Sequence, residues 1–291
     1  MTPTLSIIII NYNTYKLVEN CIQSIRQFIL SIDYEIIIVD NDSSDRDILH
    51  RLKAPDLRII LSEENLGFGK ANNLGYTYSK GKFILLLNPD TLLIDNSLEL
   101  LINIAEYNSN ACYGGILLDE NRQNTHSFGK FPTLKLFIKQ YIKSYLPFIR
   151  SHQNLQLTHI TKVDYITGAD LLIPRSVIEK FGLFNPAFFM YYEETDLQKR
   201  YNLAGIPSYI VPNVNIIHLD GGSFKKKSIR RLKMVLSGSI IYAKLNFSLI
   251  NYIIFRTLTL LLNIPKILVY PGNWKEKLSA LTLLSSIIKI K

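Results

Sequence analysis

A run of five apolar residues, Phe83–Leu87, ends abruptly in Asn88, Pro89 and Asp90, and it constrains the fold more than any other stretch of the sequence. Its composition predicts a strand buried on both faces, as in the middle of a parallel sheet covered by helices. Pro89 ends the strand, so Asp90 follows at the carboxyl end, where open α/β sheets bind their ligands and where a carboxylate can hold a divalent cation. A purely structural Asn-Pro-Asp turn is the alternative.

Three further apolar runs precede this one, and segments that suit helices separate them. They cover residues 5–10, 35–39 and 58–61. Strands that alternate with helices predict βαβ units in a mostly parallel sheet. Because the carboxyl ends of parallel strands share one edge, the polar residues that follow the four runs are expected to meet where a nucleotide would bind. These residues are Asn11, Asp40, Asn65 and Asp90.

Two neighbouring carboxylates, Glu193 and Glu194, follow the aromatic run at residues 188–192. A carboxylate beside an aromatic wall is a candidate general base with a raised pKa. The alternative is ordinary helix chemistry, with acids in the first turn and an ion pair between Asp196 and Arg200 at i, i+4.

Short strands are predicted over residues 207–211 and 215–217, and the second ends at His218. His218 heads a polar, glycine-rich loop that can bring an imidazole to a metal. A histidine with a structural role is the alternative.

The positive charge of the chain is concentrated near its C-terminus. The formal net charge is +9, yet residues 221–291 contain 13 Lys and Arg and a single acid, Glu276. Residues 1–220 therefore have no excess of positive charge that would bind a polyanion, and no nucleic-acid partner is expected. Cys21 and Cys112 lie in apolar segments and are expected to be reduced core residues of a cytoplasmic protein, and the amino terminus lacks the charged region of a signal peptide.

Two segments suit a membrane surface. Residues 133–149 place Lys135, Lys139 and Lys143 on one helical face, and residues 224–233 hold six basic side chains ahead of the apolar segment 245–270. No charge-free run reaches the ~20 residues that span a bilayer, so peripheral attachment to an anionic membrane surface is predicted. A helix docked on the body, a helical cap and a homo-oligomer interface are the alternatives.

Seven motifs, taken together and in order, resemble those of the inverting glycosyltransferases of family 2, most closely the rhamnosyltransferase-like branch. The motifs are IIIINYN, IIIVDNDSSD, NLGFGKANN, LLLNPDT, TGADLLIPR, FFMYYEETDLQKR and IIHLDGGS. The resemblance covers roughly residues 4–224. It implies an α/β GT-A nucleotide-diphospho-sugar transferase fold over residues 1–224, followed by a basic, apolar helical extension over residues 225–291.

The resemblance also implies roles for individual residues in donor binding. Asp40 would contact the pyrimidine base with Asn11 beside it, and Asp90 would bind Mg²⁺ or Mn²⁺ bridged to the donor diphosphate. His218 would be a second contact to that metal or to the diphosphate. The nucleotide-sugar-binding candidates are Asn11, Asp40, Asn65, Gly67, Asn73, Asn88 and Asp170.

Glu194 falls at the position of the catalytic base, which deprotonates the acceptor hydroxyl as it attacks the anomeric carbon opposite the leaving group. Two positions depart from the family pattern. Asn88 replaces the first acid of the DXD motif, as is usual in the rhamnosyltransferase-like branch, and the base is Glu where Asp is more common. Glu193 and Asp196 are the alternative bases.

The function that this resemblance implies is transfer of a sugar to a lipid-linked saccharide in bacterial surface polysaccharide synthesis, at the inner face of the cell membrane. The donor would be dTDP-rhamnose or another dTDP- or UDP-linked sugar. The alternative is a non-catalytic membrane scaffold that keeps the same fold.

Overall fold

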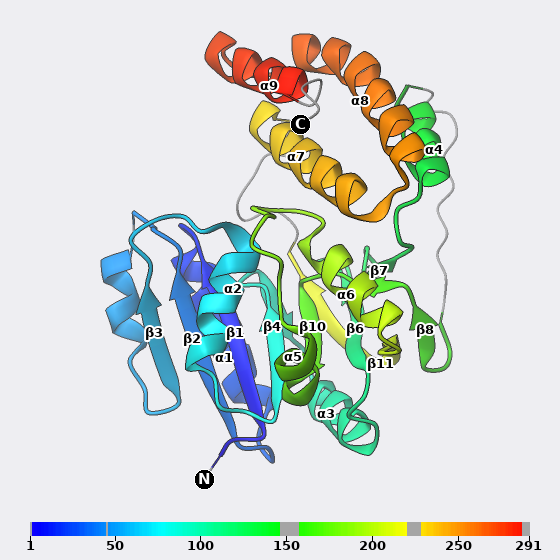
Figure 1. The fold of residues 1–291 in the computed structure, drawn as a ribbon. Coiled ribbons are helices and arrows are strands. Elements are labelled where there is room, and N and C mark those ends of the chain that lie inside the picture. Colours follow the sequence, from blue (N-terminus) through cyan, green and yellow to red (C-terminus); the bar gives the residue numbers. More distant parts are fainter. Residues whose placement is uncertain (1, 45, 146–156, 220–227, 287–291) are drawn as a thin grey trace. The chain divides into compact units, whose positions relative to one another are not determined.

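The computed structural model describes residues 2–44, 46–145, 157–219 and 228–286, and the chain divides into two compact units. The first comprises Met1–Lys130, Gln156–Phe189 and Glu193–Ser223, and the second comprises Phe131–Leu155, Met190–Tyr192 and Phe224–Lys291. The first is a twisted sheet covered by helices, and the second is a group of helices (Figure 1). Two internal segments, Phe131–Leu155 and Met190–Tyr192, therefore belong to the same unit as the C-terminal residues. The domain boundary that the sequence places after residue 224 stays a prediction.

The first unit is organised around a sheet of nine strands in the order β3-β2-β1-β4-β10-β6-β11-β5, with β8 pairing to β11 outside this order. The strands are β1 (Leu5–Asn11), β2 (Tyr34–Asp40), β3 (Leu57–Leu61), β4 (Phe83–Leu87), β5 (Thr91–Leu93), β6 (Cys112–Leu118), β8 (Thr161–Val163), β10 (Asp170–Pro174) and β11 (Ser208–His218). A separate ribbon pairs β7 (Phe128–Gly129) with β9 (Tyr165–Ile166).

The first four strands pair in parallel, as the sequence predicts, whereas β10 runs antiparallel between β4 and β6. β11 is parallel to β6 and antiparallel to β5. The two short strands predicted over residues 207–211 and 215–217 are one strand, whose register shifts between Ile210 and Asn215. The α/β architecture is confirmed, and the reversed direction of β10 brings its first residue, Asp170, opposite Leu87 at the end of β4.

Helices cover both faces of the sheet, which explains why its central strands are apolar throughout. Ile7 and Ile9 pack with α1 (Tyr15–Phe28) and α3 (Ser97–Tyr107). Ile8 and Ile10 point to the opposite face, because successive strand residues alternate. That face is covered by α2 (Gly67–Tyr78), α5 (Arg175–Phe181) and α6 (Glu193–Leu203), and a short 3₁₀ helix, η1 (Arg46–Leu52), precedes β3. Cys21 and Cys112 are both buried and free, as expected.

The second unit contains α4 (Leu134–Tyr145), α7 (Ile229–Asn246), α8 (Leu249–Val269) and α9 (Trp274–Ser286). Phe137 of α4, Ala243 of α7 and Phe255 of α8 form a buried cluster, so the aromatic face of α4 is covered by its neighbours. Lys225, Lys226 and Lys227 of the predicted basic run lie outside the described residues. Within the described ranges, α8 is the one helix whose length and composition would allow it to cross a membrane.

Candidate active site

Asn11 and Asp40 lie side by side at the carboxyl ends of β1 and β2, where the parallel register pairs them. The Asn11 amide nitrogen donates to Asp40 Oδ1 at 2.8 Å and to Ser43 Oγ at 3.1 Å, and Ser43 N donates to Asp40 Oδ2 at 3.1 Å. Both side chains are fully buried. The pair therefore ties the two strand-exit loops into one rigid floor at this edge of the sheet, which is the upper edge of the sheet in Figure 1.

Asn65 and Gly67 are held next to this floor by Asn41, a residue that the sequence analysis did not single out. Asn41 Oδ1 accepts from Leu66 N at 2.8 Å, and its amide nitrogen donates to Asn65 Oδ1 at 3.1 Å. Asn65 Oδ1 also accepts from Gly67 N at 3.0 Å. This network fixes the turn that starts α2 beside the end of β2.

Gly67 has φ of +76°, and an added Cβ would lie 2.1 Å from the carbonyl oxygen of Phe189. Replacing Gly67 by Ala is expected to lower the free energy of unfolding by about 3–5 kcal/mol, because backbone strain and a backbone clash add. Gly205 is the matched control, since its φ is +84° and a Cβ there would meet nothing within 4 Å. Gly205→Ala should cost about 1–2 kcal/mol in urea denaturation, from the strain alone. Equal losses in the two variants would show that the contact with Phe189 carries no energy.

Asn73 lies in the middle of α2, and both ends of its amide bond the backbone of Phe184. Its nitrogen donates to Phe184 O at 2.8 Å, and its oxygen accepts from Phe184 N at 3.0 Å. Asn73 therefore connects α2 to the segment before α6. It does not join the cluster at the strand ends.

Asn88, Asp90 and His218 are brought together by the antiparallel pairing of β5 with β11, in which His218 lies opposite Thr91. Asp90 Oδ1 is 3.2 Å from His218 Nε2, and the Asn88 amide nitrogen is 3.4 Å from the same ring atom. The Asp90 and His218 side chains are 14% and 19% exposed, so unlike Asp40 they are accessible to a ligand. Thr91 donates its N–H and its hydroxyl to Asn88 O, which fixes the bend at Pro89.

A carboxylate and an imidazole nitrogen at this distance suit a divalent cation that also binds phosphate oxygens and water. Mg²⁺ is commonly held by only one or two protein carboxylates together with substrate phosphates. Among the described residues, no group of three His, Cys, Asp or Glu side chains is close enough to hold a metal. Asp90 and His218 therefore fit a metal that is shared with a phosphorylated ligand, and they do not form a complete site made of protein alone.

Asp170 lies beside the group of Asn88, Asp90 and His218, because β10 is antiparallel to β4 and its first residue therefore pairs with the last residue of β4. Next to it, Asn88 N donates to Ala169 O at 3.0 Å. The Asp170 carboxylate is fully buried, and its Oδ2 accepts from Gly115 N at 2.6 Å. Its Oδ1 is buried without a hydrogen-bond partner. Burial raises the pKa of Asp170 well above its usual value, and the Gly115 hydrogen bond opposes that shift only in part. Asp170 thus joins β10 to β6 just beneath the edge.

Glu194 lies in the first turn of α6 and is half-buried, whereas Glu193 is buried. Burial raises the pKa of Glu194 to about 6, and hydrogen bonds from the backbone N–H groups of Glu194 and Thr195 partly offset the effect. Gly168 packs against it, since a Cβ on Gly168 would lie 3.9 Å from Glu194 Cβ. Glu194 thus combines partial exposure with a pKa suited to accepting a proton near neutral pH.

Asp196 is buried and forms an ion pair within α6. Its Oδ2 accepts from Arg200 Nε at 3.1 Å, which confirms the predicted i, i+4 contact. Arg200 also donates to Phe181 O and Leu183 O. This pairing gives Asp196 a structural role in α6.

Gln198, which the sequence analysis also missed, connects α6 to the strand that leads into the 167–170 loop. Its Oε1 accepts from Ile166 N at 2.8 Å, and its Nε2 donates to Ile166 O at 2.7 Å and to Glu194 O at 3.1 Å. Ser208 Oγ adds a fourth bond at 2.9 Å. Because Gln198 is fully buried, these bonds fix the turn that carries Glu194 relative to β9 and β11.

The backbone directly before α6 is unusual. Tyr191 and Tyr192 have φ of 70° and 71°, in the left-handed region that residues other than glycine rarely adopt. Two consecutive residues of this kind persist only where surrounding structure holds them, and such strain clusters at functional sites.

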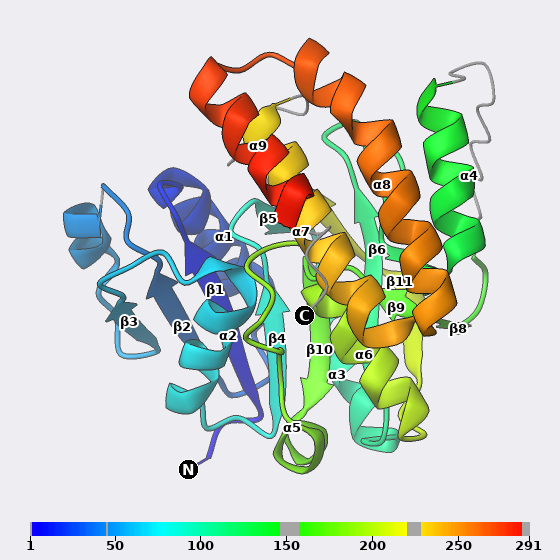
Figure 2. The ribbon, with the colours of Figure 1, turned by 45° about the horizontal axis from the view of Figure 1, so that its top comes forward.

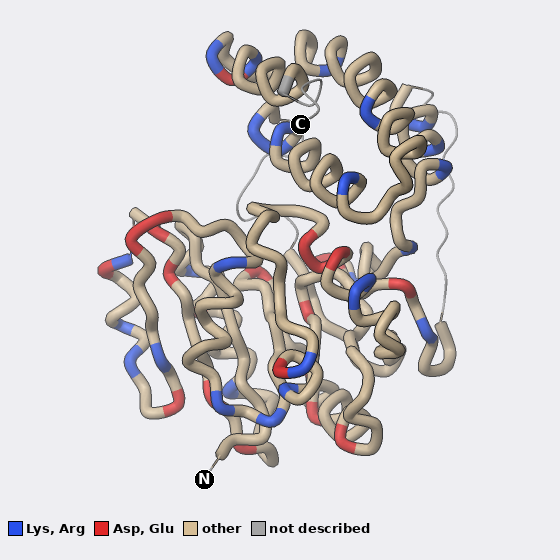
Figure 3. The backbone as a smooth tube through the Cα atoms, in the orientation of Figure 1, with Lys and Arg blue, Asp and Glu red and all other residues tan. Residues whose placement is uncertain are grey.

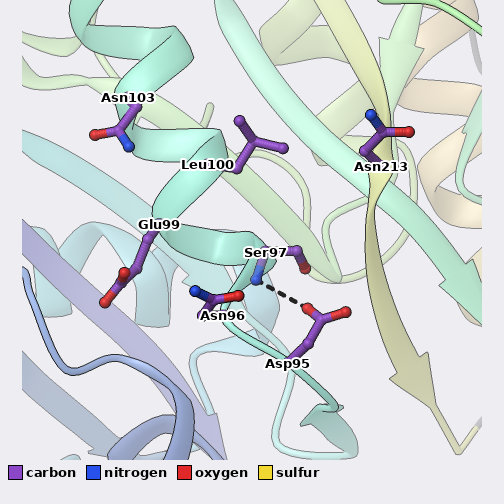
Figure 4. Close-up of a pocket in the computed structure, with 7 residues that line it drawn as sticks. All are labelled: Asp95, Asn96, Ser97, Glu99, Leu100, Asn103 and Asn213. Atoms are coloured by element: carbon purple, nitrogen blue, oxygen red, sulfur yellow. Dashed lines mark hydrogen bonds between the residues drawn. The ribbon is translucent and has the colours of Figure 1, made fainter.

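A hollow lies near the start of α3 (Figure 4). It is lined by Asp95, Asn96, Ser97, Glu99, Leu100, Asn103 and Asn213. Glu99 accepts hydrogen bonds from Leu30 N and Ser31 N, which precede β2. The hollow is therefore near the amino ends of the parallel strands, and α/β proteins bind their ligands at the opposite edge.

The sheet order and the polar strand-end edge define an α/β protein of the kind whose ligand sites lie at the carboxyl ends of the strands. The family model of glycosyl transferase family 2 matches residues 6–180, which is more than half of the chain. The protein therefore belongs to glycosyltransferase family 2 and is a transferase, as its motifs suggested. The matched region contains the candidates from Asn11 to Asp170, whereas Glu194 and His218 lie beyond it.

Similar proteins include rhamnosyltransferases. The rhamnosyltransferase WbbL of Escherichia coli K12 is 29% identical over 215 residues, which cover 68% of this chain and 78% of that protein. An N-acetylglucosaminyl-diphospho-decaprenol L-rhamnosyltransferase of Mycobacterium tuberculosis is 24% identical over 239 residues, covering 75% of this chain and 76% of the relative. These similarities agree with the rhamnosyltransferase-like branch that the motifs indicated.

A solved structure of GalNAc-T7 with UDP, GalNAc and Mn²⁺ superposes with a TM-score of 0.60 at 14% identity, and covers 89% of this chain and 54% of that chain. At this identity the likeness shows the fold alone, and it confirms the GT-A-like architecture.

Proposed function

We propose that the protein is a metal-dependent, inverting glycosyltransferase that moves a sugar from a nucleoside diphosphate to a lipid-linked saccharide. The observation that carries the proposal is the meeting of Asp90 Oδ1 and His218 Nε2 at 3.2 Å beside the nucleotide-binding edge. The similarity to two rhamnosyltransferases, one of them named for a decaprenol-linked substrate, supports dTDP-rhamnose as the first donor to test and a lipid-linked acceptor. A UDP-linked sugar is the second donor class.

In the proposed reaction, the nucleotide lies on the strand-exit loops that Asn11, Asp40, Asn65 and Gly67 hold in place. Asp90 and His218 would hold Mg²⁺ or Mn²⁺, which neutralises the charge of the departing diphosphate when bound. Glu194 takes the proton of the acceptor hydroxyl while that oxygen forms its bond to the anomeric carbon. The bond from the anomeric carbon to the diphosphate oxygen breaks on the opposite side, so one displacement inverts the configuration.

Glu194 suits the role of base better than its neighbours do. Its pKa of about 6 keeps it ionised at neutral pH and still basic enough to share a proton in the transition state. Asp196 is engaged with Arg200, and Glu193 is buried. A lipid-linked acceptor would also place the reaction at a membrane, for which we propose the inner face of the cell membrane.

The test is a donor screen with purified full-length protein, a lipid-linked saccharide acceptor and Mn²⁺, measured as released nucleoside diphosphate. We expect release with dTDP-rhamnose or with one UDP-sugar, and only when acceptor is present. Calorimetry with dTDP and UDP, with and without Mn²⁺, should show metal-dependent nucleotide binding. The absence of both transfer and metal-dependent binding would contradict the proposal and favour a non-catalytic scaffold.

A further inference from the structure

One face of α8 exposes an apolar stripe that runs along the helix and is interrupted by the exposed Thr257. We call it the outer stripe of α8, and its members are Ile250, Ile253, Ile254, Leu261, Ile264 and Leu268. They follow one another at steps of three, one, seven, three and four residues, and at 3.6 residues per turn all six lie on one side of the helix. Each is at least 38% exposed, and Ile250 reaches 72%. A soluble helix normally turns such a face toward a core, so this one calls for a partner.

The opposite face of α8 is already occupied within the helical unit. Phe255, Thr259, Asn263 and Ile267 are buried. The Phe255 ring lies 4.7 Å from that of Phe137 between centroids, and Tyr141 OH and Thr259 Oγ1 are hydrogen-bonded at 2.8 Å. Figure 2 shows α4 running alongside α8. These polar and aromatic contacts would be lost if α8 left its neighbours to cross a bilayer alone.

The charge of the same unit indicates which partner fits. Its described residues, 131–145, 190–192 and 228–286, contain eleven Lys and Arg and one acid, Glu276. Basic positions occur on all four helices (Figure 3). Two copies of such a surface would repel one another, and a nucleic acid would leave the apolar stripe in water. A bilayer with anionic headgroups would bury the apolar stripe in its interfacial layer and would attract the basic side chains.

We propose that the outer stripe of α8 inserts into the interfacial layer of an anionic bilayer, with α8 lying in the membrane plane and the basic side chains of the unit near the headgroups. Lys266 of α8 does not interrupt the stripe, since it donates to Ser144 Oγ on α4 at 2.8 Å. The inference concerns only the helical unit, so it does not depend on the transfer reaction.

The first test is flotation of the full-length protein with vesicles of phosphatidylcholine alone or with one third phosphatidylglycerol. The wild type should float with the anionic vesicles and much less with the neutral ones. Ile254→Glu and Leu261→Glu together should reduce binding at least about tenfold, because each puts a charge into the apolar layer. Leu203→Glu is the control: Leu203 is 77% exposed in α6, outside the helical unit. Wild-type-like binding by the stripe variant, or no binding by the wild type, would overturn the proposal.

A second measurement does not depend on a disruptive variant. The chain has one tryptophan, Trp274. In a Trp274→Phe background, Leu261→Trp should show a blue-shifted emission with anionic vesicles and quenching by brominated lipids, whereas Leu203→Trp should show neither. Absence of quenching at position 261 would contradict insertion. A dimer in light scattering that the stripe variant converts to a monomer would assign the stripe to a second copy of the chain and overturn the membrane proposal.

Discussion

Replacing Asp90 by Asn is expected to lower kcat/KM for sugar transfer at least about 100-fold. The substitution keeps the shape of the side chain but removes the charge that faces His218 Nε2 at 3.2 Å. A hard cation is held more weakly by an amide oxygen than by a carboxylate. Nucleoside diphosphate release should therefore require more Mn²⁺ in the variant. In the wild type, a chelator should abolish release, and added Mn²⁺ or Mg²⁺ should restore it.

Asp95→Asn is the matched control for this change. Asp95 is five residues further along the chain and accepts a hydrogen bond from Ser97 N at 2.8 Å beside the hollow of Figure 4. The same loss of one negative charge there should alter kcat/KM less than about twofold, because it is at a surface position away from the cluster. Near-normal turnover of Asp90→Asn at every Mn²⁺ concentration would remove Asp90 from the proposed metal site.

The positions of Asn11, Asp40 and Asp90 could be predicted because they depend on a regular pattern. Each follows an apolar run, and parallel strands carry their carboxyl ends to one edge. The pairing of Asn11 with Asp40 in the register of β1 and β2 agrees with that expectation. The predicted strand at Phe83–Leu87 is confirmed, and all five of its residues are buried, as a strand covered on both faces requires.

The tasks of the amide side chains could not be predicted in this way. Asn41, Asn73 and Gln198 find their partners through tertiary contacts, and nothing in residue type separates a ligand-binding amide from one that bonds a backbone. Asp170 illustrates a second limit. Asp170 lies at the carboxyl end of β4 because β10 is antiparallel to β4. An apolar run has the same composition in a parallel and in an antiparallel strand, so composition does not predict on which edge of the sheet Asp170 lies.

Replacing Glu194 by Gln is expected to lower kcat about 10²–10⁴-fold with a smaller effect on donor KM, because the acceptor proton then has no base to receive it. The exposed Glu179 on α5 is the control, and Glu179→Gln should transfer sugar as the wild type does. Glu193→Gln is the informative comparison. If that variant loses the activity and Glu194→Gln keeps it, the role of base belongs to Glu193.

The pH dependence distinguishes loss of a base from a general loss of structure. The base must be ionised, and its pKa is about 6, so wild-type kcat/KM should rise about tenfold per pH unit below 6 and level off above it. The residual activity of Glu194→Gln should not show this rise of kcat/KM between low pH and pH 6.

The pKa of Glu194 is raised above its ordinary value of 4.5 in the folded state, so ionisation of Glu194 destabilises the fold as pH increases from 4.5 to 6. Glu194→Gln removes that charge and should unfold at pH 7 at a temperature no lower than the wild type. A variant that loses both activity and thermal stability would instead indicate that Glu194 mainly supports the first turn of α6.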